Sequence, residues 1–374
     1  MQRPGESREP TVLKSKVPLR GTGMKLIDYL SQRFRYQTRD SWDRLIAADK
    51  VLVNGEPADP DRPLAHGDTV AYTVVLEEPV VDADVRIIHE EESFAVAIKP
   101  GQLPSHADGR FIRNTFIHIV SRMLEEALPL TPGPKRPGPE PAKPGPGRPS
   151  PPANKAGGGG NTVGPAHMAP LGVPARSRVM LVHRLDRETS GVMVVARNKG
   201  AHADLMRQFA AGSVDKEYLA VAKGLIEGGP FEVKGWIGRD PASTISIRHA
   251  LFPEPRTGAR DSVTAFEPVR LLAGATLLRC VPRTGRTNQI RVHLASIGHG
   301  VVGDKLYGRT DAEFLEFVEF VKAGGDPSFD GRVGTPRQLL HASRLAFDHP
   351  VTRMRVSFEA PMPADMAGYV EANG

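Results

Sequence analysis

The carboxylate of Asp186 lies between two arginines in a short polar segment, residues 184–191. Aspartate, threonine, serine and glycine are common turn residues, so the segment alone indicates a turn held by local hydrogen bonds. If Arg184 and Arg187 faced the carboxylate, they would favour its ionised form, which suits a nucleophile or a general base. Taken alone, the pattern favours the plain turn, so a catalytic interpretation needs support from elsewhere in the chain.

Two residues further along the chain could assist such a carboxylate. Tyr218 lies in the run 216–222, where polar and apolar residues alternate as in a half-buried strand, and packing alone would explain it. Arg291 lies in a predicted helix over 288–297, where a place on the outer face would be the simpler explanation. Neither residue identifies an active site from its local pattern.

The longer run His183-Arg184-Leu185-Asp186-Arg187-Glu188-Thr189-Ser190-Gly191 resembles the signature of the RluA-type pseudouridine synthases, in which the aspartate is the catalytic residue. The segment 109–115 is similar to a stretch of a subgroup that includes eukaryotic tRNA- and mRNA-modifying members, which tilts the expected target weakly towards tRNA. The resemblance extends from about residue 23 to residue 362, except for 129–178. Its other segments, in family order, are 85–106 with Lys99-Pro100-Gly101, 216–220, 284–293, 303–308 and 340–342.

This resemblance implies an isomerase that breaks the glycosidic bond of a uridine, turns the free base and rejoins it through a ring carbon, without a cofactor or a metal. Asp186 would attack the anomeric carbon of the sugar or remove a proton from the neighbouring carbon, and the sequence leaves both routes open. Arg291 would keep the carboxylate ionised through a bidentate pair. Tyr218 would stack on the target base, and Arg184 would help to extrude the nucleotide, which is easiest in a loop of structured RNA.

Two positions depart from the family pattern. Asn288 stands where histidine is usual, and Gly300 stands where proline is usual. We expect altered packing or RNA contacts there, with activity retained. The spacing of His183, His293 and His341 matches no common zinc pattern, so we expect structural or RNA-contacting histidines and no metal.

A small module is predicted over residues 23–76, with two helices followed by short strands and an Asn-Gly turn at 54–55. Its leucine-rich first helix, its Leu45-Ile46 pair and the run 51–55 resemble the S-four-type RNA-binding domain, named after a ribosomal protein. In such domains the helices place basic side chains along the RNA backbone, although a solvated basic face is an equal alternative for any single residue. The candidates for RNA binding are Arg33, Arg35, Arg39, Arg44 and Lys50.

The net charge of +6 is weak evidence for RNA binding, because it is concentrated in one segment. Residues 129–178 hold seven basic residues and one acidic residue, so the remaining chain is neutral. This segment is also rich in proline and glycine and poor in large apolar residues, which predicts a disordered insertion. A tolerated surface loop is the favoured explanation over an RNA-binding role.

The domain organisation follows from these segments. We expect a flexible lead over residues 1–22, the S-four-like domain over 23–76, a linker over 77–84 and a catalytic domain over 85–362, interrupted by the insertion at 129–178 and followed by a tail over 363–374. The catalytic domain should belong to the α+β class, with a mixed, largely antiparallel sheet flanked by helices, as in the pseudouridine synthase fold. The clearest helical patterns are 201–211, 288–297 and 311–323.

The leading functional hypothesis is a pseudouridine synthase that acts on rRNA or tRNA, as a soluble and cytoplasmic monomer. Cys280, the single cysteine, excludes an internal disulfide, and no apolar run reaches the roughly 20 residues of a membrane-spanning helix. The alternative is a non-catalytic RNA-binding or ribosome-assembly factor on the same fold, which would have no need of Asp186, Tyr218 and Arg291 together. A hydrolase of the N-glycosidic bond would share the early chemistry but would need a site that admits water.

Overall fold

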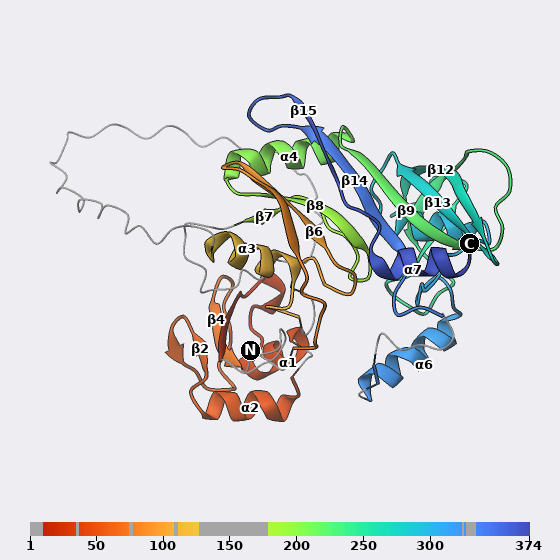
Figure 1. The fold of residues 1–374 in the computed structure, drawn as a ribbon. Coiled ribbons are helices and arrows are strands. Elements are labelled where there is room, and N and C mark those ends of the chain that lie inside the picture. Colours follow the sequence, from red (N-terminus) through yellow and green to blue (C-terminus); the bar gives the residue numbers. More distant parts are fainter. Residues whose placement is uncertain are drawn as a thin grey trace.

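The computed structural model describes residues 10–34, 37–74, 78–107, 111–126, 179–323, 325–326 and 334–374. The predicted insertion at 129–178 and the predicted RNA-binding residue Arg35 lie outside the described residues. A small N-terminal domain lies at the bottom left of Figure 1, and a large sheet runs above it towards the right. Every helix within the described ranges is too short or too polar to cross a bilayer.

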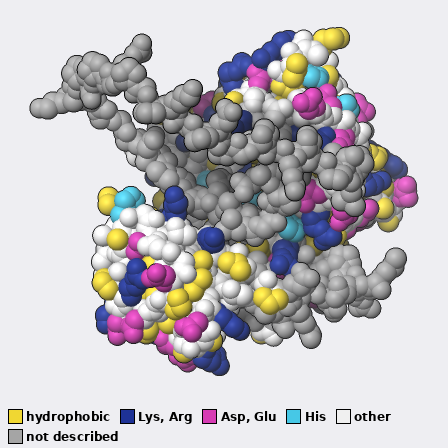
Figure 2. Space-filling view, turned by 90° about the vertical axis from the view of Figure 1, so that its left-hand side faces the viewer, with side chains coloured by type: hydrophobic (Ala, Val, Ile, Leu, Met, Phe, Trp, Pro, Cys, Tyr) yellow, Lys and Arg dark blue, Asp and Glu magenta, His cyan; other side chains and the backbone are white. Residues whose placement is uncertain are grey.

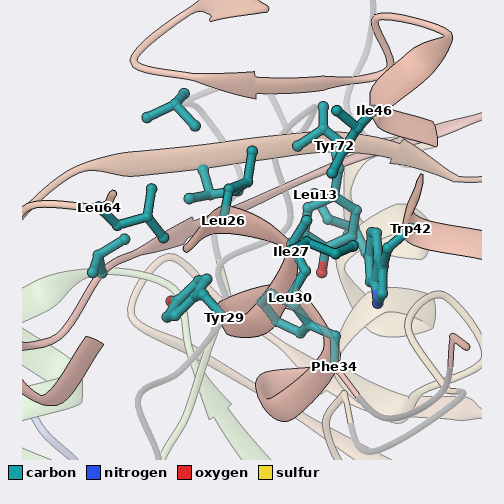
Figure 3. Close-up of a cluster of buried hydrophobic side chains, with 14 of the residues drawn as sticks. Leu13, Leu26, Ile27, Tyr29, Leu30, Phe34, Trp42, Ile46, Leu64 and Tyr72 are labelled. Carbon is teal, nitrogen blue, oxygen red and sulfur yellow. The ribbon is translucent and has the colours of Figure 1, made fainter. Parts of the chain in front are cut away.

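The small domain consists of two helices packed on a four-stranded antiparallel sheet with the order β1-β4-β2-β3. Aromatic rings fill its core: the Trp42 ring meets the Tyr72 ring edge-on at 4.9 Å between centroids, and Phe34 lies 5.1 Å from Tyr72. Figure 3 shows these rings between the helices and the strands. The elements are β1 (Thr11–Lys16), α1 (Leu26–Arg33), α2 (Arg39–Ala47), β2 (Val51–Val53), β3 (Glu56–Pro57) and β4 (Thr69–Val74).

The prediction of a flexible lead over residues 1–22 is wrong from residue 11 onwards, where the chain forms a strand. Residues 11–16 form β1, which pairs antiparallel with β4, and Leu13 and Val17 are buried in the core of the small domain. Alternation of apolar and polar residues drives this packing, because Lys14 and Lys16 lie on the exposed face of the strand. The lysines made the segment look polar in composition, which concealed its period of two.

The linker joins the two domains through a compact contact. The carboxylate of Glu78 accepts hydrogen bonds from the backbone N–H groups of Ile112, Arg113 and Asn114, at 2.8–3.0 Å. The side chain of Ile112 packs in the same apolar cluster as the core of the small domain. The small domain is therefore fixed against the segment that leads into α3.

The large domain is built on one eleven-stranded sheet. Nine of its strands follow the order β11-β10-β12-β13-β9-β14-β8-β6-β5; in addition, β15 pairs with β14 and β7 pairs with β8. All its pairs are antiparallel except that of β14 with β8. This sheet confirms the predicted α+β class. The strands are β5 (Arg86–Glu90), β6 (Phe94–Lys99), β7 (Met180–Leu181), β8 (Ser190–Ala196), β9 (Asp215–Lys223), β10 (Phe231–Arg239), β11 (His249–Phe252), β12 (Arg260–Leu272), β13 (Ala275–Pro282), β14 (Leu340–Asp348) and β15 (Arg355–Glu359).

Helices cover both faces of the sheet. On the half with β6 and β8, α3 and α4 pack on opposite faces, which is why every residue of β8 is buried. On the half with β9 and β13, α5 and α7 do the same. The helices are α3 (Phe116–Glu126), α4 (Lys199–Ala211), α5 (Gln289–Ser296), α6 (Asp311–Lys322) and α7 (Ala364–Ala372).

The prediction of a tail over residues 363–374 is wrong, because most of this segment forms the packed helix α7. Met366 and Val370 are buried against β9 and β13, and Pro363 precedes the helix with an extended backbone. Two buried residues one helical turn apart suffice to dock such a short helix, but they give only a weak periodic signal in the sequence.

Strand β8 begins at the point where the two halves of the sheet meet. Ser190 and Gly191 pair there with His341 and Ala342 of β14, in parallel. Gly191 has a φ of +126°, and a Cβ atom on it would collide with the backbone of Ala342. Only glycine fits at this junction, and the segment just before it carries Asp186.

Candidate active site

Asp186 lies in a turn that connects β7 to β8, which we call the Asp186 turn (residues 182–189). The backbone N–H of Thr189 donates to the carbonyl oxygen of Asp186 at 3.1 Å, which closes the turn. The hydroxyl of Ser105 both donates to the carbonyl of Leu185 (2.7 Å) and accepts from its N–H (3.1 Å). With Leu185 buried, the carboxylate of Asp186 is held at the surface of a cleft and is 30 % exposed.

Helix α5 brings Arg291 to this carboxylate. Its Nη1 donates to Oδ2 of Asp186 at 2.8 Å, and its side chain is buried between the turn and the helix. The expected bidentate pair forms with another residue, Asp304, whose two oxygens accept from Nε (2.6 Å) and Nη2 (2.9 Å). Arg291 thus lies inward on α5, and the alternative of a place on the outer face does not apply.

The carboxyl group of Asp304 is fully buried and still ionised. Burial alone would raise its pKa, but the Arg291 guanidinium and the backbone N–H groups of Leu306 and Tyr307 hold this pKa below its ordinary value. Burial likewise disfavours the charge of Arg291, but the two carboxylates outweigh that effect and raise the pKa of the guanidinium. The three groups form a charged row with a net charge of −1.

Asn288, one of the two departures from the family pattern, supports this row. Its Oδ1 accepts from Nη1 of Arg291 at 2.9 Å, and its Nδ2 donates to the hydroxyl of Tyr307 at 3.1 Å. Its backbone has a φ of +57°, in the left-handed region that asparagine tolerates better than most residues. Asn288 therefore takes part in the packing around Arg291 and Tyr307.

Tyr218 lies on β9 and reaches the same cleft. Its ring is half-buried and packs against the apolar clusters on both halves of the sheet. Burial raises the pKa of its hydroxyl, and the negative charge of Asp186 raises it further. The hydroxyl therefore stays protonated at neutral pH.

The two arginines beside Asp186 behave differently from each other. Arg184 is exposed at the mouth of the cleft, where it has no ion pair with any described residue. Arg187 turns to the neighbouring Glu188, at 3.3 Å. Neither of them forms an ion pair with Asp186, and Arg291 does so instead.

Together these residues line a cleft of about 510 Å³, including solvent at its mouth. The structure thus brings Asp186 and Arg184 of the Asp186 turn together with Tyr218 of β9 and Arg291 of α5, from three separate segments. The cleft is lined by Arg184, Leu185, Asp186, Thr189, Lys216, Tyr218, Pro282, Thr284, Gly285, Arg286, Asn288, Gln289, Ile290, Arg291 and Leu340.

A second layer of charged residues, which the sequence analysis did not predict as part of the site, holds the far end of the Asp186 turn. The buried Arg337 donates from Nη1 to the carbonyl of Glu188 (3.0 Å) and pairs through Nε and Nη2 with Asp365 of α7 (2.6 and 2.9 Å). The carboxylate of Glu188 accepts from Lys305 at 2.7 Å. Glu188 and Lys305 lie in segments that resemble the family motifs, and this resemblance could have pointed to them. Asp365 lies outside these segments, so no such signal marks it.

Lys99 fixes the turn from the opposite side. Its ammonium group is buried and donates to the backbone carbonyls of Pro100 (2.9 Å), Leu103 (2.8 Å) and Arg187 (3.1 Å). Burial, followed by the charge of Arg337, lowers the pKa of Lys99 well below its ordinary value. Its three bonds join the Lys-Pro-Gly segment to the backbone that follows Asp186.

The histidines singled out in the sequence make structural hydrogen bonds. His183 accepts from the backbone N–H of Val194 at 3.1 Å, and its ring stacks on Phe209. His293 lies between the hydroxyls of Ser262 and Thr264, and His341 between Ser190 and the carbonyl of Ala360. Within the part of the chain that the structure describes, no group of three or more acidic, histidine or cysteine side chains could hold a metal ion.

Four of the predicted RNA-binding residues are described, and they lie on or beside the helices of the small domain. Arg33 donates to Ser15 at 3.2 Å and Arg39 pairs with Asp28 at 2.6 Å. Arg44 makes a long bond to Ser41, and Lys50 is exposed after α2. On the face shown in Figure 2, basic and acidic side chains are interspersed over the small domain, at the bottom of the view.

Comparisons with known proteins identify the family. A sequence model described as RNA pseudouridylate synthase matches residues 169–296. The chain is 30% identical to the ribosomal large subunit pseudouridine synthase D of Xanthomonas campestris, over 98% of this chain and 95% of that protein. It is 29% identical to an uncharacterized RNA pseudouridine synthase of Bacillus subtilis, over 91% and 92% of the two chains.

A solved structure shares the fold. Human RNA pseudouridylate synthase domain containing 1 superposes with a TM-score of 0.50 at 21% identity, over 77% of this chain and 89% of that one. This likeness agrees with the mixed sheet described above. The resemblance seen in the sequence is confirmed by the relatives that span nearly the whole chain. The chain belongs to the RluA-type family of RNA pseudouridine synthases.

Proposed function

We propose that this pseudouridine synthase flips a specific uridine out of a structured RNA and isomerises it with Asp186 as the catalytic carboxylate. One observation carries the proposal: Arg291 binds Oδ2 of Asp186, while no described donor reaches Oδ1 of the same carboxylate. A carboxylate that an arginine holds by one oxygen, on a side chain that is 30 % exposed and lines the cleft, suits a nucleophile or a base. Tyr218 and Arg184 line the same cleft.

Two balanced routes use this oxygen. In the first, Oδ1 forms an ester with the anomeric carbon while the bond from that carbon to N1 of uracil breaks; the turned base then attacks through C5, the ester breaks, and the C5 proton passes to N1. In the second, the carboxylate removes the proton of the neighbouring sugar carbon as the base leaves with the electron pair of the broken bond on N1. C5 of the turned base then bonds to the anomeric carbon, the carboxylate returns the proton to the sugar carbon, and the C5 proton passes to N1. Both routes start from a carboxylate at Asp186, and Arg291 places a positive charge 2.8 Å from its Oδ2.

The other residues take supporting roles. The ring of Tyr218 offers an apolar face for the flipped base, because it is half-buried in β9 beside Asp186. Arg184, exposed at the mouth of the cleft, would occupy the place that the nucleotide leaves in the RNA. Asp304 sets the position of the Arg291 guanidinium through its two hydrogen bonds.

The target is best sought among ribosomal RNAs. The relative from Xanthomonas campestris carries the name of a ribosomal large subunit enzyme and aligns over nearly the whole chain. This favours large-subunit rRNA over tRNA. We further propose that the small domain acts as an S-four-like RNA-binding domain, with Arg33, Arg35, Arg39, Arg44 and Lys50 contacting the RNA backbone.

One experiment tests the catalytic role of Asp186. Purified wild type and Asp186→Ala are incubated with total RNA, and pseudouridines are mapped chemically. The wild type should add pseudouridines at discrete positions, and Asp186→Ala should add none while keeping its thermal unfolding midpoint. Asp84→Asn removes an exposed carboxylate in the linker and should match the wild type.

Two results would contradict the proposal. Identical pseudouridine maps for wild type and Asp186→Ala would favour a non-catalytic RNA-binding factor. Abasic sites in place of pseudouridines would favour a hydrolase of the N-glycosidic bond.

A further inference from the structure

Strand β9 carries a second side chain into the cleft beside Tyr218. Lys216 lies two residues before Tyr218, so both side chains project from the same face of the strand, and both line the cleft with Asp186. The Lys216 ammonium makes one long hydrogen bond, to the carbonyl oxygen of Thr284 at 3.5 Å. Among the described residues, no carboxylate forms an ion pair with it.

The surroundings of Lys216 are those of a cation that lacks its counter-ion. Burial lowers the pKa of its ammonium group, and the charge of Arg286 lowers it further. A half-buried charge is unfavourable unless a partner compensates the lost hydration. The neighbouring Asp215 compensates this charge only in part: it favours the charged form of Lys216 from a distance, while its carboxylate pairs with Arg355.

Arg286 adds a second positive group to the same wall of the cleft. It lies in the loop between β13 and α5, and it pairs with Asp261 at 2.9 Å. The Asp261 side chain is 64 % exposed, so water weakens this pair. Lys216 and Arg286 therefore bring positive charge to the cleft from β9 and from the β13–α5 loop.

The charges of the cleft show what kind of ligand group this wall fits. Arg291 already pairs with both Asp186 and Asp304, and neither of these carboxylates forms an ion pair with Lys216. A uracil base carries no charge, so it offers no counter-ion to Lys216. Each nucleotide of RNA, however, brings a phosphate next to its base and sugar, and phosphate is the anion to which protein cations bind in RNA complexes.

We propose that Lys216, assisted by Arg286, binds the phosphodiester next to the target uridine and so forms a phosphate subsite of the cleft. This inference rests on the proposed function, because it takes the flipped uridine as the occupant of the cleft. Tyr218 and Lys216 then act as a pair on one strand, with the ring contacting the base and the ammonium contacting the backbone. The pair would fix the sugar between them, next to Asp186.

The test measures binding apart from catalysis. The full chain carrying Asp186→Asn is titrated with a fluorescent oligouridylate of about 12 nucleotides, at salt concentrations from about 50 to about 200 mM. Adding Lys216→Met should weaken binding about tenfold and reduce the slope of log K against log salt by about 0.7, the value for one phosphate of a single strand. Lys216→Arg keeps the charge and should restore both quantities.

A matched control removes the same charge elsewhere. Lys199 is exposed at the start of α4, beyond the far end of β8, about 20 Å from the Asp186 turn. Lys199→Met should leave the slope unchanged. An equal effect of Lys199→Met and Lys216→Met, an unchanged slope for Lys216→Met, or no binding of the oligouridylate by the parent protein would each overturn the subsite.

The same variants separate this inference from the catalytic proposal. Pseudouridine formation by the wild type together with an unchanged salt slope for Lys216→Met would refute the phosphate subsite alone. A reduced slope without any pseudouridine formation by the wild type would support phosphate binding and refute the catalytic proposal. A fall of the unfolding midpoint of Lys216→Met with an unchanged slope would assign the lysine a purely structural role and overturn the subsite.

Discussion

Arg291 gives Asp186 a single hydrogen bond, from Nη1 to Oδ2 at 2.8 Å. The other edge of the guanidinium is occupied by Asp304, so Arg291 cannot turn to bind both oxygens of Asp186. A bidentate pair with Asp186 would have neutralised the carboxylate and blocked both of its oxygens. The single bond orients the group and leaves one oxygen for the substrate.

Because Asp304 forms a buried ion pair with Arg291, Asp304→Asn should reduce both the stability and the activity of the enzyme. Removing one charge from a buried ion pair leaves the other uncompensated, so we expect a loss of about 3–5 kcal/mol in the free energy of unfolding. Pseudouridine formation should fall by at least about tenfold, because Arg291 loses its anchor. Urea denaturation and rate measurements check both effects. As a control, Asp186→Asn changes a more exposed carboxylate and should alter the free energy of unfolding by less than about 1 kcal/mol. A larger loss of stability in Asp186→Asn than in Asp304→Asn would contradict the prediction.

Tyr218→Phe separates packing from the hydroxyl. The ring stays in place between the two apolar clusters, so the free energy of unfolding should change by less than about 1 kcal/mol. If the hydroxyl takes part in proton transfer, the single-turnover rate should fall by about 10²-fold or more. Because burial raises the pKa of Tyr218, the wild-type rate should show no ionisation of this group between pH 6 and pH 9. An unchanged rate in Tyr218→Phe would restrict the residue to stacking.

Arg337 is expected to act on the rate through the position of the Asp186 turn. Arg337→Lys loses the bidentate pair with Asp365 and the geometry of its bond to the carbonyl of Glu188, so the turnover number should fall about tenfold or more. The KM for RNA should change little, because Arg337 is buried and contacts no RNA. Arg344→Lys, at a partly exposed arginine of β14, serves as the control. A lower stability with an unchanged turnover number would show that Arg337 has no positioning role.

The buried histidines predict a loss of stability in mild acid. Burial, with a smaller effect of Lys216, lowers the pKa of His183 to about 3, and burial lowers the pKa of His293 to about 4. Below pH 6.5 the unfolded chain therefore binds more protons than the folded one, and the free energy of unfolding falls as the pH falls. The stability is complete above about pH 6.5 and decreases towards pH 3–4.

Denaturation in urea at pH 7.5 and pH 5 measures this effect. We expect each of these histidines to account for about 1–2 kcal/mol of the difference. His183→Gln should keep an acceptor for the N–H of Val194 while removing its share of the pH dependence. His66→Gln, at an exposed position, should leave the difference unchanged. Equal pH dependence in wild type and His183→Gln would refute the assignment.

The sequence predicted those parts of the molecule whose signals are local. The helices α4, α5 and α6 were expected within one or two residues of their observed bounds, because their apolar residues repeat with the helical period. The segments that resemble the family motifs predict that Asp186, Tyr218 and Arg291 belong to one site, and all three line the same cleft. Continuous motifs of this kind hold the residues that line one cleft.

Other features arise only from contacts between distant parts of the chain. The bidentate pair between Asp304 and Arg291 depends on the turn after α5. In this turn the backbone N–H groups of Leu306 and Tyr307 donate to Oδ1 of Asp304 and so orient its carboxylate. The placement of β1 in the sheet depends on its pairing with β4. The role of Arg337 depends on Asp365, in a helix with only two buried residues and therefore a weak periodic signal. No local pattern contains these partners.

The contact between Asp365 and Arg337 also sets an order of events during synthesis. Asp186 is joined to the growing chain about 180 residues before Asp365, which corresponds to about 10 to 35 seconds of translation. Throughout that interval the chain holds its reactive carboxylate without the helix that completes the support behind it. We therefore expect nascent chains to gain activity only after α7 has left the ribosome, and prematurely released fragments to lack it.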